Sequence, residues 1–174
     1  MCQGVPLLRG KLQEDGGMTT KVHEMGRGHY GNLAIMTLVS FIAMFILMYP
    51  MVDRFADVYP NVNQAYMAGL MAAPMVLIEL AVMRSMYPDM RMNLAFAGIA
   101  ALALMLFFFG IRAQTAVGNV QFVKSMIPHH SGALLMCGQA SITDAELKKL
   151  CTEIIEGQQK EIDQMKAILA RLDR

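Results

Sequence analysis

The 174-residue sequence is poor in charge, lacks tryptophan and has only three cysteines. Charged residues make up 17% of the chain, below the roughly 25% that is usual for soluble domains. The 15 basic and 14 acidic residues nearly cancel, so the clustered positive field that nucleic-acid phosphates require is missing. Three cysteines cannot build a disulfide scaffold, and 55% hydrophobic content excludes disorder through most of the chain. What remains is a small membrane protein with an attached polar segment.

Three long stretches contain almost no charge. Residues 32–52 and 92–111 carry none, and residues 65–83 carry only Glu79. About 20 apolar residues take a helix across the hydrocarbon core of a bilayer, so each stretch predicts a transmembrane helix. We therefore expect an all-α chain in three parts. These are a partly disordered cytoplasmic leader over residues 1–30, a three-helix transmembrane domain over residues 31–112, and a helical-hairpin metal-binding domain over residues 113–174.

The basic residues predict how the chain crosses the membrane. On the side of the leader and the second connection lie six of them: Arg9, Lys11, Lys21, Arg27, Arg84 and Arg91. On the other side lie three: Arg54, Arg112 and Lys124. By the positive-inside rule, we expect the N-terminus in the cytoplasm and residues 113–174 outside it, in a multi-pass protein of the inner membrane.

After residue 113 the apolar residues follow a helical period. One stripe consists of Phe122, Met126, His129, Ala133 and Met136, and after a turn near Ser141 a second consists of Leu147, Leu150, Ile154, Gln158, Glu161, Met165, Ile168 and Leu172. We expect an antiparallel hairpin in which these stripes face each other, with charged residues such as Lys166 on the exposed face. Two helices alone bury little. Either further copies of the chain or an extension of the third transmembrane helix must complete the bundle, and we expect a homo-oligomer.

The stretch Met-Ile-Pro-His-His at residues 126–130 contains the best candidates for metal ligands. Adjacent histidines on a helix point about 100° apart, so at most one of them looks into the seam. Met126 precedes His129 by three residues and His130 by four, which lets its thioether share a patch with either imidazole. Thioether and imidazole form a soft donor set that suits Cu(I) and, by extension, Ag(I). Without metal, one histidine lines the seam and the methionines serve as packing.

Residues 122–136 (FVKSMIPHHSGALLM) and 154–165 (IIEGQQKEIDQM) resemble the "domain of unknown function 305" family, with both halves in order. The three-helix front is similar to that of membrane-anchored members. The resemblance implies ferritin-like helical packing, a frequent extracytoplasmic location and, in some members, copper binding in copper tolerance. It also points to a set of metal ligands: Met126, His129, His130, Met136, Gln158, Glu161 and Met165.

Iron and enzymatic activity are not expected. Residues 113–140 contain no Asp or Glu, so the histidine helix lacks the carboxylates that a di-iron centre takes from its helices. Only Asp53 and Asp57 lie on the same side of the membrane and near enough to substitute. The chain has no Gly-rich phosphate loop, no Gly-x-Ser-x-Gly elbow and no Ser-His-acid set.

Three further features leave alternatives open. Met67, Met71, Met75, Glu79 and Met83 form a ladder, but steps of four residues drift about 40° each, which favours packing over a transport path. Met136 and Met165 lie about 10 Å along the axis from His129, on opposite sides, so either several shallow sites or a symmetric dimer is needed. Cys137 and Cys151 flank the turn. They could form a disulfide, serve as soft metal ligands or be buried as free thiols.

The sequence therefore predicts a membrane-anchored protein that binds copper or silver for metal tolerance or buffering. The alternative is a structural or assembly module that pairs through its outer helices without metal.

Overall fold

The computed structural model describes the backbone of residues 15–173 and the side chains of residues 28–173. The elements are α1 (Asp15–Leu47), the 3-10 turns η1 (Tyr49–Met51) and η2 (Phe55–Asp57), α2 (Val62–Val82), α3 (Met90–Arg112), α4 (Asn119–Gln139) and α5 (Ala145–Leu172). Over the described residues the chain is all-helical, as predicted. The disorder expected at the start of the leader falls largely on residues 1–14, which lie outside the described range.

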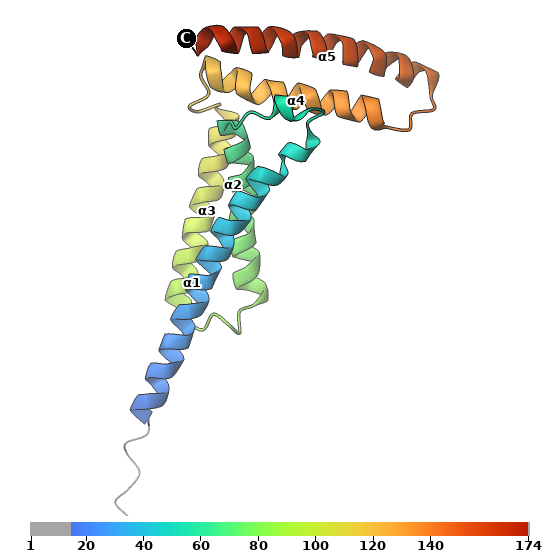
Figure 1. The fold of residues 1–174 in the computed structure, drawn as a ribbon. Helices are drawn as coiled ribbons and strands as arrows, with labels where there is room; N and C mark the ends of the chain where they lie inside the picture. Colours follow the sequence, from blue (N-terminus) through green and yellow to red (C-terminus); the bar gives the residue numbers. More distant parts are fainter. Residues whose placement is uncertain (1–14, 174) are drawn as a thin grey trace, which may run out of the picture.

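Within the described part of the chain, three helical segments are long and apolar enough to cross a membrane: Gly28–Met51, Val62–Val82 and Met90–Arg112. They match the three predicted stretches to within a few residues, and we call them the three-helix unit. In this unit α2 packs against both α1 and α3 (Figure 1). The buried face of α2 consists mostly of small residues: Ala68, Gly69, Ala72, Ala73, Val76 and Leu80. The ladder residues Met67, Met71 and Met83 are instead 41%, 48% and 39% exposed, on surface that would face lipid.

The absence of a side chain at Gly69 lets α2 and α3 pack closely. A Cβ at this position would overlap the ring of Phe107 on α3. At the end of the unit away from the hairpin, Tyr30 and Tyr87 are buried in a shared cluster. The hydroxyl of Tyr87 donates to the carboxylate of Glu79 over 3.0 Å. Burial, followed by the neighbouring Glu79, raises the pKa of Tyr87 to about 12, so the phenol stays a donor and the Glu79 carboxylate has a partner.

The hairpin lies across the end of the three-helix unit, with α4 next to the unit and α5 along the far side of α4 (Figure 1). Pro128 lies inside α4 and has no N–H, so the carbonyl of Lys124 loses its helical hydrogen bond. The side-chain amide of Asn61, the N-cap of α2, donates to that carbonyl over 3.4 Å. The next residue, Val62, donates its backbone N–H to the side chain of Gln121 over 3.1 Å. The start of α2 is thereby docked on α4.

A buried carboxylate ties the connection between α1 and α2 to both helices of the hairpin. Asp57 is 3% exposed. It accepts a hydrogen bond from Ser131 of α4 over 2.7 Å and pairs with the ammonium group of Lys166 of α5. The backbone N–H of Asp53 also donates to Ser131, over 2.9 Å. The expectation that Lys166 lies on the exposed face was wrong: its side chain is 33% exposed, because the connection covers that side of α5.

We predict that Asp57→Ala destabilises the protein by about 2 kcal/mol, which is below the roughly 3–5 kcal/mol for breaking a fully buried ion pair because Lys166 keeps some solvent. The reason is that Lys166 and Ser131 both lose their shared partner. The double variant Asp57→Ala/Lys166→Met should lose less, since no unpaired ammonium group remains. Thermal unfolding of the detergent-solubilised chain, followed by circular dichroism, measures both. Equal losses in the two variants would show that the ion pair does not hold the hairpin in place.

Candidate functional site

The seam between α4 and α5 lies one residue out of phase with the stripe predicted on α4. Its buried core consists of aliphatic residues: Val123, Ile127, Leu134, Ile162 and Leu169. Phe122 and Met136, which were predicted to line the seam, are 52% and 56% exposed, and His129 is exposed as well. Neighbouring residues point about 100° apart on a helix, so a shift by one residue turns the whole predicted stripe out of the seam. The predicted seam on α4 was therefore wrong.

His130, rather than His129, enters the seam. The residue as a whole is 8% exposed. Its Nδ1 lies 2.9 Å from the backbone oxygen of Met126, and its Nε2 lies 2.8 Å from a carboxylate oxygen of Glu161 on α5. Both ring nitrogens thus face oxygen atoms of the protein. A metal ion at Nε2 would have to come between His130 and Glu161.

His129 lies on an open side of α4. Its ring centroid is 6.1 Å from that of His130, and no described side chain or carbonyl forms a hydrogen bond with it. Met126 precedes it by one turn and is half-buried. Met136 follows two turns later, about 10 Å along the axis. We call this side the α4 flank and define it by Phe122, Met126, His129, Ala133 and Met136. The flank presents one imidazole and two thioethers.

The predicted residues of α5 lie in or beside the seam. Met165 packs against the seam core, and Glu161 has a side chain that is 58% exposed apart from its bond to His130. Gln158 is half-buried, and its side-chain oxygen is buried without a hydrogen-bond partner among the described residues. Leu147 and Leu150 were expected inside the hairpin. They are 51% and 49% exposed, so that expectation was wrong.

The seven predicted ligands therefore fall into two sets. The seam set consists of His130, Gln158, Glu161 and Met165, and the flank set of Met126, His129 and Met136. Over residues 28–173 no three His, Cys, Asp or Glu side chains come close enough together to hold one ion. The structure thus brings His130 and Glu161 together, but it does not join the seven residues into one site within a single chain.

Sequence reasoning missed the role of Ser131 and treated Asp57 only as a carboxylate that could substitute at an iron site. Asp57 is held by Lys166 and Ser131, so both of its oxygens are already engaged. No local sequence pattern indicates these contacts, because Asp57 and Lys166 are 109 residues apart in the sequence.

The turn of the hairpin is asymmetric. A turn centred between Ile142 and Thr143 would set Cys137 level with residue 148. The structure instead joins Cys137 to Cys151 in a disulfide with a Cα–Cα distance of 5.2 Å, which is within the usual range for disulfides. The offset of three residues is nearly one helical turn. Of the three open readings of this pair, the structure shows the disulfide.

The comparisons with known proteins agree with a two-part chain. A model of the family described as Domain of unknown function (DUF305) matches residues 111–174. The uncharacterized protein L153 of Acanthamoeba polyphaga mimivirus is 29% identical over 140 residues, which cover 79% of this chain and 90% of that protein. Because residues 111–174 are far fewer than 140, this likeness extends into the three-helix unit. No solved structure matches significantly.

We predict that Gln158→Met stabilises the protein. The change keeps the length of the side chain and removes a buried acceptor whose unmet hydrogen bond costs about 1 kcal/mol or more. Differential scanning fluorimetry should give a higher Tm. The control is Gln159→Met, which removes a hydrogen bond to Asp163 of 3.0 Å and should bring no gain. A lower Tm for Gln158→Met would mean that this oxygen has a partner in solution.

Proposed function

We propose that this chain, with its three helices fit to cross a bilayer, is a membrane-anchored protein that binds Cu(I) and, by extension, Ag(I). Its role is metal tolerance or buffering on the extracytoplasmic side of the inner membrane. The observation that carries this proposal is the α4 flank, where His129 and Met136 are exposed and Met126 is half-buried. Imidazole nitrogen and thioether sulfur are the donors that soft ions prefer. His130 already contacts Met126 and Glu161 in the seam. His129 forms no hydrogen bond within the described part of the chain.

A single flank offers too few donors for one ion. Met126 and His129 are one turn apart and can share an ion, but Met136 lies about 10 Å from His129. Residues 126 and 136 are equally distant from Ser131. An antiparallel pairing of two flanks around a two-fold axis near Ser131 would therefore set Met126 level with the partner's Met136. Each ion would then have one imidazole and two thioethers, and a dimer would hold two ions.

The exposed apolar side chains support such a homodimer. Phe122 and Met136 on α4, and Leu147 and Leu150 on α5, are each about half exposed. Large apolar side chains that stay exposed on an amphipathic hairpin are surface that a partner could cover. Burial in a dimer would place four helices together, which is the usual way for a two-helix hairpin to obtain a core.

The second candidate is an assembly module without metal. The observation in its favour is His130, whose two ring nitrogens already contact Met126 and Glu161, so that the protein itself supplies partners for the ring. In this case the flank would bind its partner through apolar contacts alone. Metal stoichiometry separates the two functions.

We predict that the full chain in detergent binds about one Cu(I) per chain in the flank, as the proposed dimer with two ions requires. Anaerobic titration against a chromophoric Cu(I) chelator measures this. The variant Met126→Leu/His129→Gln/Met136→Leu keeps the approximate size of the side chains but removes the thioether and imidazole donors that Cu(I) prefers, and it should lose this ion.

The matched control for that titration makes one His→Gln and two Met→Leu changes away from the hairpin: His29→Gln/Met90→Leu/Met92→Leu. It should bind as the unaltered protein does. The proposal fails if the flank variant and the unaltered protein bind Cu(I) equally, or if neither binds it.

We also predict that Cu(I) shifts the chain from monomer to dimer, because the third donor comes from a second flank. Light scattering corrected for the detergent should show a rise in mass that is lost in the flank variant and reversed by a chelator. A dimer that forms equally well with and without metal would favour the assembly module.

A further inference from the structure

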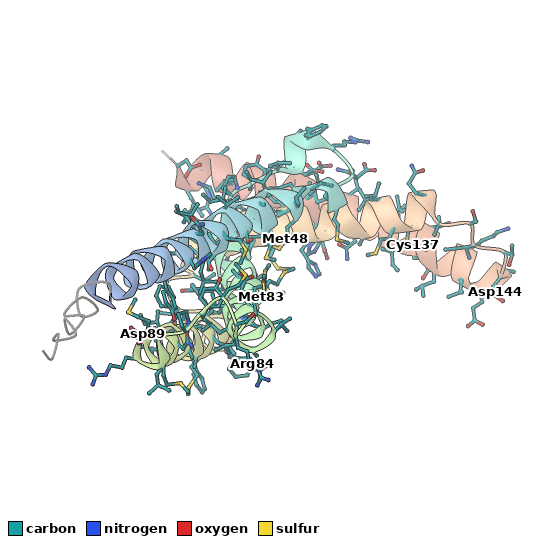
Figure 2. All side chains as sticks on the ribbon, turned by 90° about the horizontal axis from the view of Figure 1, so that it is seen from below. Met48, Met83, Arg84, Asp89, Cys137 and Asp144 are labelled. Carbon is teal, nitrogen blue, oxygen red and sulfur yellow. A yellow bond between two sulfur atoms is a disulfide. The ribbon has the colours of Figure 1, made fainter. Side chains whose placement is uncertain are left out.

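The hydrophobic core of the hairpin fills only the half that lies near the three-helix unit. The last buried residue of α4 before the turn is Leu134, and the first of α5 after it is Ile162. Between these positions every residue is exposed or half-buried. This part of the hairpin, which we call the tip (residues 135–161), extends beyond the three-helix unit. Figure 2 shows this extension, with Cys137 and Asp144 labelled along it.

Cys137 and Cys151 provide the covalent link across the tip. Both residues are half-buried, so the pair is not enclosed in the protein interior. The disulfide joins α4 to α5 beyond the end of the aliphatic core. Without it, the two helices would still be held together near the three-helix unit by the seam and by Asp57. The two cysteines would then remain close neighbours after the bond is broken.

We propose that this cysteine pair is a redox-gated binding site for one Cu(I) or Ag(I) ion, separate from the α4 flank. As a disulfide the pair offers no ligand. After reduction its two thiolates bind one ion between them. The proposal rests on the soft-metal function proposed above, but it concerns different residues.

The chemistry needs only a monothiol such as glutathione. Two molecules of the monothiol break the S–S bond of Cys137 and Cys151, and their own sulfurs become joined in a new disulfide. The protein gains two S–H groups. Cu(I) then replaces the two protons, which pass to solvent, because a thiol binds metal only as the thiolate.

The geometry and the surroundings fit an ion that takes two ligands. Metal–sulfur bonds of about 2.3 Å would place two sulfurs on opposite sides of one ion about 4.6 Å apart. Side-chain rotation can open the sulfurs to such a separation, because the Cα atoms are 5.2 Å apart. No group of three His, Cys, Asp or Glu gathers here or elsewhere in residues 28–173. Zn(II) requires four ligands, so the pair should discriminate against it.

The test uses the full chain in detergent, reduced with glutathione and freed of it by anaerobic gel filtration. Titration against a chromophoric chelator should show one more Cu(I) per chain than in the oxidised protein, with ultraviolet absorption from thiolate-to-copper charge transfer. Cys137→Ser/Cys151→Ser should abolish this gain, whereas Cys2→Ser should keep it. No gain on reduction, or a gain that survives the double change, overturns the proposal.

Two further measurements keep this site distinct from the flank. The variant Met126→Leu/His129→Gln/Met136→Leu should lose the ion that oxidised protein binds and keep the ion gained on reduction. In the unaltered reduced protein, the added Cu(I) should protect both Cys137 and Cys151 from alkylation by iodoacetamide, and Zn(II) should not. Equal protection by Zn(II), or alkylation unaffected by Cu(I), would show that the cysteines do not hold the ion.

Discussion

The arrangement of the molecule depends on one missing backbone hydrogen bond. Pro128 leaves the carbonyl of Lys124 without a helical donor, and a buried carbonyl needs a partner. Asn61, the N-cap of α2, supplies it from its side-chain amide. The interruption in α4 is therefore also its point of attachment to the three-helix unit. His129 and His130 follow Pro128 directly, so the histidines lie beside this attachment.

This attachment divides the hairpin into two parts with different properties. In the part near the three-helix unit, Asp57 binds both Ser131 and Lys166, and the aliphatic core fills the seam. A carboxylate buried to this degree requires both partners, because an unpaired charge in such a place is strongly unfavourable. The tip has neither the aliphatic core nor the Asp57–Lys166 ion pair. There the disulfide links α4 to α5. Loss of that bond would affect the tip first.

The sequence predicts the three-helix unit well because the bilayer imposes a simple requirement, about 20 uncharged residues per helix. The seam was harder to predict. The stripes that begin at Phe122 and at Val123 share one period, and periodicity reveals the spacing of a buried face but not which of two adjacent stripes is buried. Lys166 was assigned to solvent from its own helix alone. Its partner Asp57 lies in a connection 109 residues away, which no local pattern can show.

The two functions considered for the hairpin place opposite demands on His129. If two flanks met without metal, the apolar contacts of Phe122 and Met136 would bring the imidazole of His129 into an interface without a hydrogen-bond partner, at a cost of about 1–3 kcal/mol. If a metal bound to one flank alone, Met126 and His129 would leave the ion short of donors. A metal ion shared by two chains removes both difficulties, because it gives His129 a partner and takes its third donor from the second chain. We therefore propose assembly and metal binding as one property of the α4 flank.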